Sequence, residues 1–140
     1  MNPYLAGVVA GLAAAGAWLV ANLLTDFAFL GVIRRHHEQL NPTLMARPAL
    51  NLLILAADLA FWGAIFGLGY VWVRPVLPGG SLLSGLLWGL LVFVPFSRAL
   101  VENSLWTTVP RALNTFWLVE GLAGLATWGA VLGPLFAWLA

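Results

Sequence analysis

The stretch ALNLLILAADLAFWGAIFGLGYVWV, from Ala49 to Val73, decides the fold of this chain. At about 1.5 Å per residue, a helix over these residues is long enough to cross the roughly 30 Å hydrocarbon core of a bilayer. Asp58 lies in the middle of the stretch and is its only charged residue. A charge at the centre of a membrane helix costs about 2.5–3.5 kcal/mol, so we expect Asp58 to be paired or functional.

The composition independently indicates a membrane protein. Hydrophobic residues make up 62% of the chain and charged residues only 8%, which leaves too few polar side chains to cover a water-soluble surface. With about 20 residues needed for each crossing, 140 residues suffice for four helices but for no sizeable soluble domain. We therefore expect one transmembrane domain over residues 1–140. The first apolar segment lacks a preceding basic region, so we interpret it as a retained helix.

The predicted fold class is an all-α integral membrane protein, a bundle of four antiparallel transmembrane helices. Apolar runs separated by polar or Pro- and Gly-containing segments place the helices at about 3–33, 48–73, 81–100 and 114–140. In lipid each run can satisfy its own backbone hydrogen bonds only as a helix. The short connection 74–80 contains two prolines and two glycines, and we expect it to make the second and third helices antiparallel neighbours.

The arginines predict the orientation, since the chain has no lysine. All but one of them lie in or beside the connections 34–47 and 102–113: Arg34, Arg35, Arg47, Arg98 and Arg111. Only Arg74 lies in the connection on the other side. By the positive-inside rule, the loops 34–47 and 102–113 are predicted to be cytoplasmic and both termini to lie outside.

An internal repeat relates the two halves of the chain. The sequence LAFWGAIFG at 59–67 returns as LATWGAVLG at 125–133, and the triplet ALN at 49–51 returns at 112–114. These matches predict two repeated helical hairpins related by an axis along the membrane normal. Glu120 lies about as far beyond Asn114 as Asp58 lies beyond Asn51, so each half carries one intramembrane acid.

The acids suggest a polar pocket that opens inward, around Asp58 and Glu120. The residues we expect to bind a ligand or a proton there are Asp58, Glu120, Arg98, Asn22, Asp26, Glu102 and Trp62. Two structural interpretations compete with this one. Arg98 could form a buried ion pair with Asp58 that fixes the helix register, or it could extend to the headgroups beside Glu102. An aromatic pocket for a pigment, quinone or sterol is a less favoured interpretation of the eight tryptophans.

Each predicted helix also contains a Gly-x-x-x-Gly pair, which lets helix backbones approach closely in lipid. The pairs are Gly7 and Gly11, Gly63 and Gly67, Gly85 and Gly89, and Gly129 and Gly133. All four lie in the predicted outer half, so we expect tight packing there and a cavity in the inner half. The glycine faces of the second and fourth helices contact either the rest of the bundle or another subunit, and the sequence leaves both options open.

Several classes of site lack support in the sequence. Without cysteine there is no disulfide and no thiolate ligand, and the adjacent His36 and His37 have too few partners for a metal or haem site. No phosphate-binding Gly-rich loop or catalytic triad spacing is present, and the charges are too scattered for nucleic-acid binding. We therefore predict no cofactor, no metal and no nucleic-acid partner. The loop with Arg34 and Arg35 is interpreted as an anchor for acidic lipid headgroups.

The segment WGAIFGLGY at 62–70, which leads into LPGGS at 77–81, and the terminal GAVLG at 129–133 resemble small uncharacterised four-helix inner-membrane proteins of bacteria. The resemblance implies four helices and a bacterial plasma-membrane location, and it implies no activity. Asp58 and Glu120 are not features that this resemblance supplies.

Three functions remain as hypotheses. The favoured one is an accessory or ligand-binding membrane subunit, in contact with lipids and part of a homo-oligomer or a larger membrane complex. The first alternative is a small proton-coupled or cation transporter or channel that works as a homo-oligomer. The second alternative is a membrane enzyme, which has the least support because no catalytic motif is present.

Overall fold

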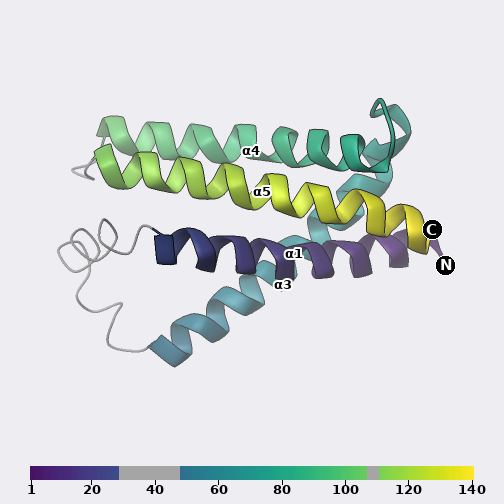
Figure 1. The fold of residues 1–140 in the computed structure, drawn as a ribbon, viewed down its shortest axis with the longest axis horizontal. Helices are drawn as coiled ribbons and strands as arrows, with labels where there is room; N and C mark the ends of the chain where they lie inside the picture. The colour runs from purple at the N-terminus through teal and green to yellow at the C-terminus, as the bar shows by residue number, and fades with distance from the viewer. Residues whose placement is uncertain (29–47, 107–110) are drawn as a thin grey trace.

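A computed structural model describes residues 1–28, 48–106 and 111–140, and within these residues the chain is helical (Figure 1). The four long helices are α1 (Pro3–Ala28), α3 (Pro48–Val73), α4 (Ser81–Trp106) and α5 (Arg111–Leu139), and a short 3-10 helix, η2 (Arg74–Val76), follows α3. All four contain an apolar segment long enough to cross a membrane. The predicted all-α architecture with four such helices is therefore confirmed.

Two of the predicted helix boundaries are wrong. Helix α4 continues to Trp106 instead of ending at 100, and α5 begins at Arg111 instead of 114, so most of the expected loop 102–113 is helical. The sequence has no Gly or Pro between residues 96 and 109 to stop α4, and Arg98 and Glu102 support it as an i,i+4 pair. Residues 29–33 of the expected first helix and the loop 34–47 lie outside the described residues.

Glycines bring α1 and α3 into backbone contact. A Cβ atom on Gly11 would overlap the carbonyl oxygen of Gly63, and one on Gly67 would overlap the carbonyl oxygen of Gly7. Helices meet this closely only where both lack side chains at the contact, and oblique crossings are common at such contacts. Helix α3 accordingly crosses α1 at a clear angle (Figure 1).

The second pair of helices, α4 and α5, is joined in the same way. A Cβ on Gly85 would overlap the carbonyl oxygen of Gly129, and one on Gly133 would overlap the carbonyl oxygen of Ser81. These two helices lie side by side along most of their length (Figure 1). The eight glycines singled out in the sequence thus face glycines or backbone of a neighbouring helix in the same chain.

Residues of α1, α3 and α5 form the buried core. Trp128 of α5 is 1% exposed and donates from Nε1 to the Gly11 carbonyl oxygen at 3.4 Å. Small residues of α1 leave space for this indole. The core comprises Ala10, Ala14, Tyr70, Leu125, Trp128 and Leu132.

Helices α3 and α4 are not the neighbours that their short connection predicts. They meet only near the turn, where Tyr70 Oη and Ser84 Oγ share a hydrogen bond of 2.7 Å and Trp88 Nε1 donates to the Phe66 carbonyl oxygen at 3.0 Å. Away from the turn α3 diverges from α4 (Figure 1). The reason is that the glycine face of α3 packs on α1, whereas that of α4 packs on α5.

Large apolar side chains cover much of the outer surface. Phe27 is 76% exposed, Trp72 is 74% exposed and Trp138 is 81% exposed. Monomeric water-soluble proteins rarely expose contiguous apolar surface on this scale. The four candidate spans and this surface together indicate a multi-pass membrane protein.

Alanine at Gly67 should destabilise the fold, because its Cβ has no space against the Gly7 carbonyl oxygen. We expect Gly67→Ala to lower the free energy of unfolding by about 1–3 kcal/mol, the usual cost of overpacking. Denaturation in mixed micelles, followed by circular dichroism, measures this change.

Gly16 is the matched control, since it is exposed and a Cβ there would meet nothing within 4 Å. Gly16→Ala should leave stability unchanged or raise it by up to about 1 kcal/mol, through better helix propensity. Equal effects of the two substitutions would contradict the close contact between α1 and α3.

Candidate functional site

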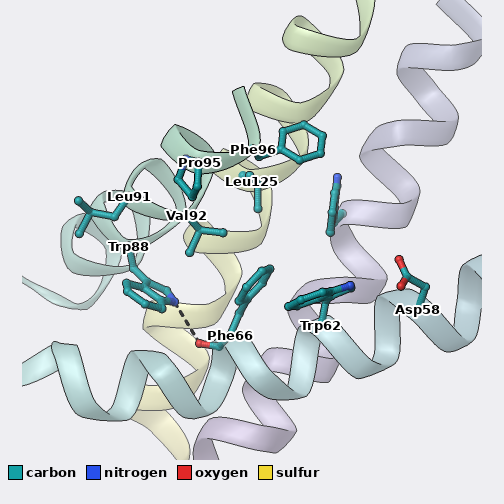
Figure 2. A pocket seen from close by; sticks show the side chains of 10 residues that line it. Asp58, Trp62, Phe66, Trp88, Leu91, Val92, Pro95, Phe96 and Leu125 are labelled. Carbon is teal, nitrogen blue, oxygen red and sulfur yellow. Dashed lines mark hydrogen bonds between the residues drawn. The ribbon is translucent and has the colours of Figure 1, made fainter. Parts of the chain in front are cut away.

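A cavity of about 620 Å³ lies where α3 and α4 diverge, and we call it the aromatic groove. It exists because the two helices are joined at one end only. Helices α3 and α4 form its walls, and one residue each from α1 and α5 completes it. Its lining residues, most of which are labelled in Figure 2, are Trp18, Asp58, Trp62, Phe66, Trp88, Leu91, Val92, Pro95, Phe96 and Leu125.

The α3 wall carries Asp58, Trp62 and Phe66, which lie one helical turn apart and project to the same side (Figure 2). Trp62 stacks on Phe66 with ring centroids 5.3 Å apart and an interplanar angle of 29°. Asp58 is exposed, and among the described residues it is the only charged one that lines the groove. One carboxylate therefore lies at the edge of an otherwise apolar and aromatic surface.

Contacts with the core hold the groove walls in place. The indole of Trp88 is fixed by its hydrogen bond to the Phe66 backbone, drawn as the dashed line in Figure 2. Phe66 also meets buried Trp128 edge to face, with ring centroids 5.6 Å apart. Because the Phe66 and Trp88 rings are fixed from behind, this part of the groove is pre-formed.

A smaller cavity of about 260 Å³ lies between α1, α4 and α5, and we call it the Glu120 pocket. Its lining residues are Trp18, Asn22, Phe96, Trp117, Glu120 and Gly121. Glu120 is partly buried, and Asp26 lies close enough to interact with its charge. Among the described residues, no hydrogen bond or ion pair forms to the Glu120 carboxylate.

Trp18 and Phe96 separate the two cavities, since both residues line each of them. Glycines of α5 make room for these rings. A Cβ on Gly124 would overlap the Trp18 indole, and one on Gly121 would come within 2.5 Å of the Phe96 ring. The partition therefore depends on Gly121 and Gly124, which lie on the helix that carries Glu120 but belong to none of the Gly-x-x-x-Gly pairs named above.

The predicted site residues fall into separate places. Asp58 and Trp62 line the aromatic groove, whereas Asn22 and Glu120 line the other cavity, with Asp26 beside Glu120. Asp58 and Glu120 thus line different cavities, which adjoin at Trp18 and Phe96. Sequence spacing gave the depth of each acid along its helix, but the side of the bundle that each faces depends on how the helices pack.

Of the two structural alternatives for Arg98, the ion pair with Asp58 is not present among the described residues. Arg98 Nε donates to Glu102 Oε1 at 2.8 Å, one helical turn further along α4, and the two side chains are 81% and 53% exposed. The alternative in which Arg98 extends outwards beside Glu102 matches this geometry. Neither residue lines either cavity.

Most residues of the aromatic groove were not predicted from the sequence. Phe66, Trp88 and Phe96 were not among the predicted site residues, yet all three line the cavity. The i,i+4,i+8 spacing of Asp58, Trp62 and Phe66 was a usable signal, because it places one acid and two rings on a single helix face. Within the described residues, no group of three His, Asp or Glu side chains lies together as a metal site would require.

Removing the charge of Arg98 should have little effect on stability, because exposed ion pairs contribute only about 0–1 kcal/mol. We expect Arg98→Gln to change the free energy of unfolding by no more than about 1 kcal/mol in mixed micelles. A loss of about 3–5 kcal/mol, the size found when a buried pair is broken, would show that Arg98 has a buried acidic partner after all.

No family model matches this chain, and neither a curated protein nor a solved structure matches it. The two cavities and the residues that line them are therefore the basis for assigning a function.

Proposed function

We propose that this chain is a multi-pass membrane protein that binds an organic cation with a large apolar body in the aromatic groove. The observation that carries the proposal is the position of Asp58 at the edge of a groove lined by five aromatic rings, those of Trp18, Trp62, Phe66, Trp88 and Phe96. A carboxylate attracts the cationic centre, and indole faces add cation–π attraction of about 0.5–2 kcal/mol each. The apolar walls accept the rest of the ligand.

The charge of Asp58 favours a cation over other ligands. Asp58 lies within the candidate span Leu53–Val76, and no ion pair to it forms among the described residues. An uncompensated carboxylate at this depth is costly, and a bound cation would offset that cost. An anionic ligand would be repelled, and a neutral apolar ligand would leave the carboxylate without a partner.

The size of the groove sets the size of the ligand. A volume of about 620 Å³ falls within the range of roughly 300–1,000 Å³ that is usual for small-molecule sites. The groove lies between two diverging helices, so a lipophilic ligand could enter sideways from the bilayer. At the joined end the buried residues Tyr70 and Ser84 close the space between α3 and α4.

This arrangement favours binding over the other hypotheses. An accessory subunit that packs on its partner through glycine faces would need those faces to be free, but Gly63 and Gly67 contact α1, and Gly129 and Gly133 contact α4. Transport would need a second access route past the closed end of the groove. Assembly into a homo-oligomer or a larger complex remains a prediction.

The proposal also includes the location of the chain in a bacterial inner membrane, its orientation there, and the duplication of a helical hairpin. The arginine distribution supports a cytoplasmic position for the end of the bundle where α1 ends and α5 begins, and the resemblance noted above supports a bacterial inner membrane. The equivalent glycine contacts in α1–α3 and α4–α5 support duplicated hairpins. The halves have diverged, since Trp62 is 40% exposed in the groove whereas its counterpart Trp128 is 1% exposed in the core.

Benzyltriethylammonium is a suitable probe, because it combines an aromatic ring with a permanent positive charge. We expect saturable binding to the protein in nanodiscs, measured by isothermal titration calorimetry. Asp58→Asn should weaken this binding at least about tenfold, or about 1.4 kcal/mol, because the attraction to the carboxylate is lost.

Two controls make this test specific. Glu102→Gln should leave binding unchanged, since Glu102 lies outside both cavities. The neutral analogue N,N-diethylbenzamide should bind the unsubstituted protein more weakly than the cation does. It should bind the Asp58→Asn variant as tightly as it binds the unsubstituted protein. The proposal fails if Asp58→Asn binds the cation as tightly as the unsubstituted protein does.

Single cysteines test the crossing of the membrane, because the chain has none of its own. Gly80 and Arg111 are exposed and lie at opposite ends of the bundle. We expect Gly80→Cys to react with an impermeant maleimide from outside intact cells, and Arg111→Cys to react only after the cells are opened. Labelling of both from the same side would contradict the proposed topology.

A further inference from the structure

The Glu120 pocket differs from the aromatic groove in its chemistry. Among its described lining residues are a carboxylate, an amide and two indoles, from Glu120, Asn22, Trp18 and Trp117. The groove, although larger, has Asp58 as its one described polar side chain apart from the indole nitrogens. The smaller cavity therefore offers several hydrogen-bonding groups in a space that suits a molecule of few atoms.

Buried polar atoms near this pocket lack partners. Trp18 Nε1 and Asn22 Oδ1 are both shielded from solvent, and neither has a hydrogen bond within the described residues. Both atoms lie against Gly124, where a Cβ would overlap the first and come within 2.9 Å of the second. An unsatisfied buried polar atom costs about 1–3 kcal/mol, so a bound molecule that satisfied these atoms would be stabilised.

The charge around the pocket selects a cation. Glu120 lines the cavity and Asp26 adds a second negative charge nearby. The guanidinium of Arg98 on the neighbouring helix α4 is paired with Glu102 and lines neither cavity. The Glu120 carboxylate would repel an anionic ligand here.

The groups in the pocket fit an amine better than a metal ion. Hard metal ions take about six or more oxygen ligands, whereas Asn22 and Glu120 are the described lining residues with side-chain oxygens. An ammonium group needs only a few acceptors, and its remaining surface can rest on indole and phenyl faces. We propose that the Glu120 pocket is a second binding site, separate from the aromatic groove, for a small primary ammonium ion that also carries an oxygen atom.

In this site the ammonium donates hydrogen bonds to the Glu120 carboxylate and lies beside the ring faces of Trp117 and Phe96. After a small side-chain adjustment, the ligand oxygen accepts from Trp18 Nε1, and an N–H or O–H of the ligand donates to Asn22 Oδ1. The same chemistry occurs in free ethanolamine and in the headgroup of phosphatidylethanolamine, so the test must separate these two sources.

The probe is ethanolamine hydrochloride, titrated into the full chain in nanodiscs of phosphatidylglycerol, which has no amine. We expect saturable one-to-one binding by calorimetry, at an ionic strength matched with sodium chloride. Glu120→Gln should weaken it at least tenfold, and Asn22→Ala should weaken it a few-fold. Asp58→Asn should leave it within twofold, whereas the same variant loses benzyltriethylammonium.

The outcomes distinguish this site from the aromatic groove. Equal ethanolamine binding by the unsubstituted protein and by both Glu120→Gln and Asn22→Ala would overturn the proposal, and so would the absence of saturable binding. If Glu120→Gln does not fold, judged by circular dichroism, Asn22→Ala alone decides. Weaker ethanolamine binding in nanodiscs that contain phosphatidylethanolamine identifies the lipid headgroup as the natural ligand, and unchanged binding identifies a free amine.

Discussion

Backbone contact between glycines is the interaction on which the rest of this structure depends. Gly11 meets Gly63 and Gly67 across α1 and α3, and the equivalent contact joins α4 to α5. In a lipid environment apolar side chains gain little by leaving the solvent, so close van der Waals packing of small residues is what holds helices together. Each hairpin is consequently a firm unit, and the two units meet through α1 and α5.

The aromatic groove follows from this choice of partners. Because the glycine face of α3 is committed to α1, α3 cannot also follow α4, and the two helices separate beyond the turn that connects them. Long side chains fill the space only near that turn, through the Tyr70–Ser84 and Trp88–Phe66 hydrogen bonds. The remaining volume is lined by rings, and Asp58 lies at its edge. The glycine contact between α3 and α1 thus determines both the packing of the helices and the position of the groove.

Trp18 connects the two candidate sites. Its indole lies against Gly124 and lines both cavities, so a ligand that moves this ring changes the walls of each. The structure places Asp58 and Glu120 on opposite sides of this partition, although the repeat in the sequence makes them counterparts. Two segments with matching sequence therefore contribute to two unlike sites, one largely apolar and one polar, with one aromatic residue between them.

The sequence by itself determined the number and character of the helices, because a run of about 20 apolar residues has few alternatives in lipid. It also determined which residues allow close contact, since glycine spacing is a local property. The sequence predicted the helix ends less reliably. Helix α4 continues past residue 100 and α5 begins before residue 114, because the polar residues there do not interrupt a helix.

Only the tertiary structure decided which helices become neighbours and which side of the bundle each polar group faces. The depth of Asp58 and Glu120 along their helices follows from counting residues, but their separation by Trp18 and Phe96 follows from crossing and rotation. Arg98 could pair with any acid at its depth, and the geometry of α4 selected Glu102. The physical reason is that the rise along a helix is fixed by its own hydrogen bonds, whereas its partners and rotation are set by contacts between residues far apart in the chain.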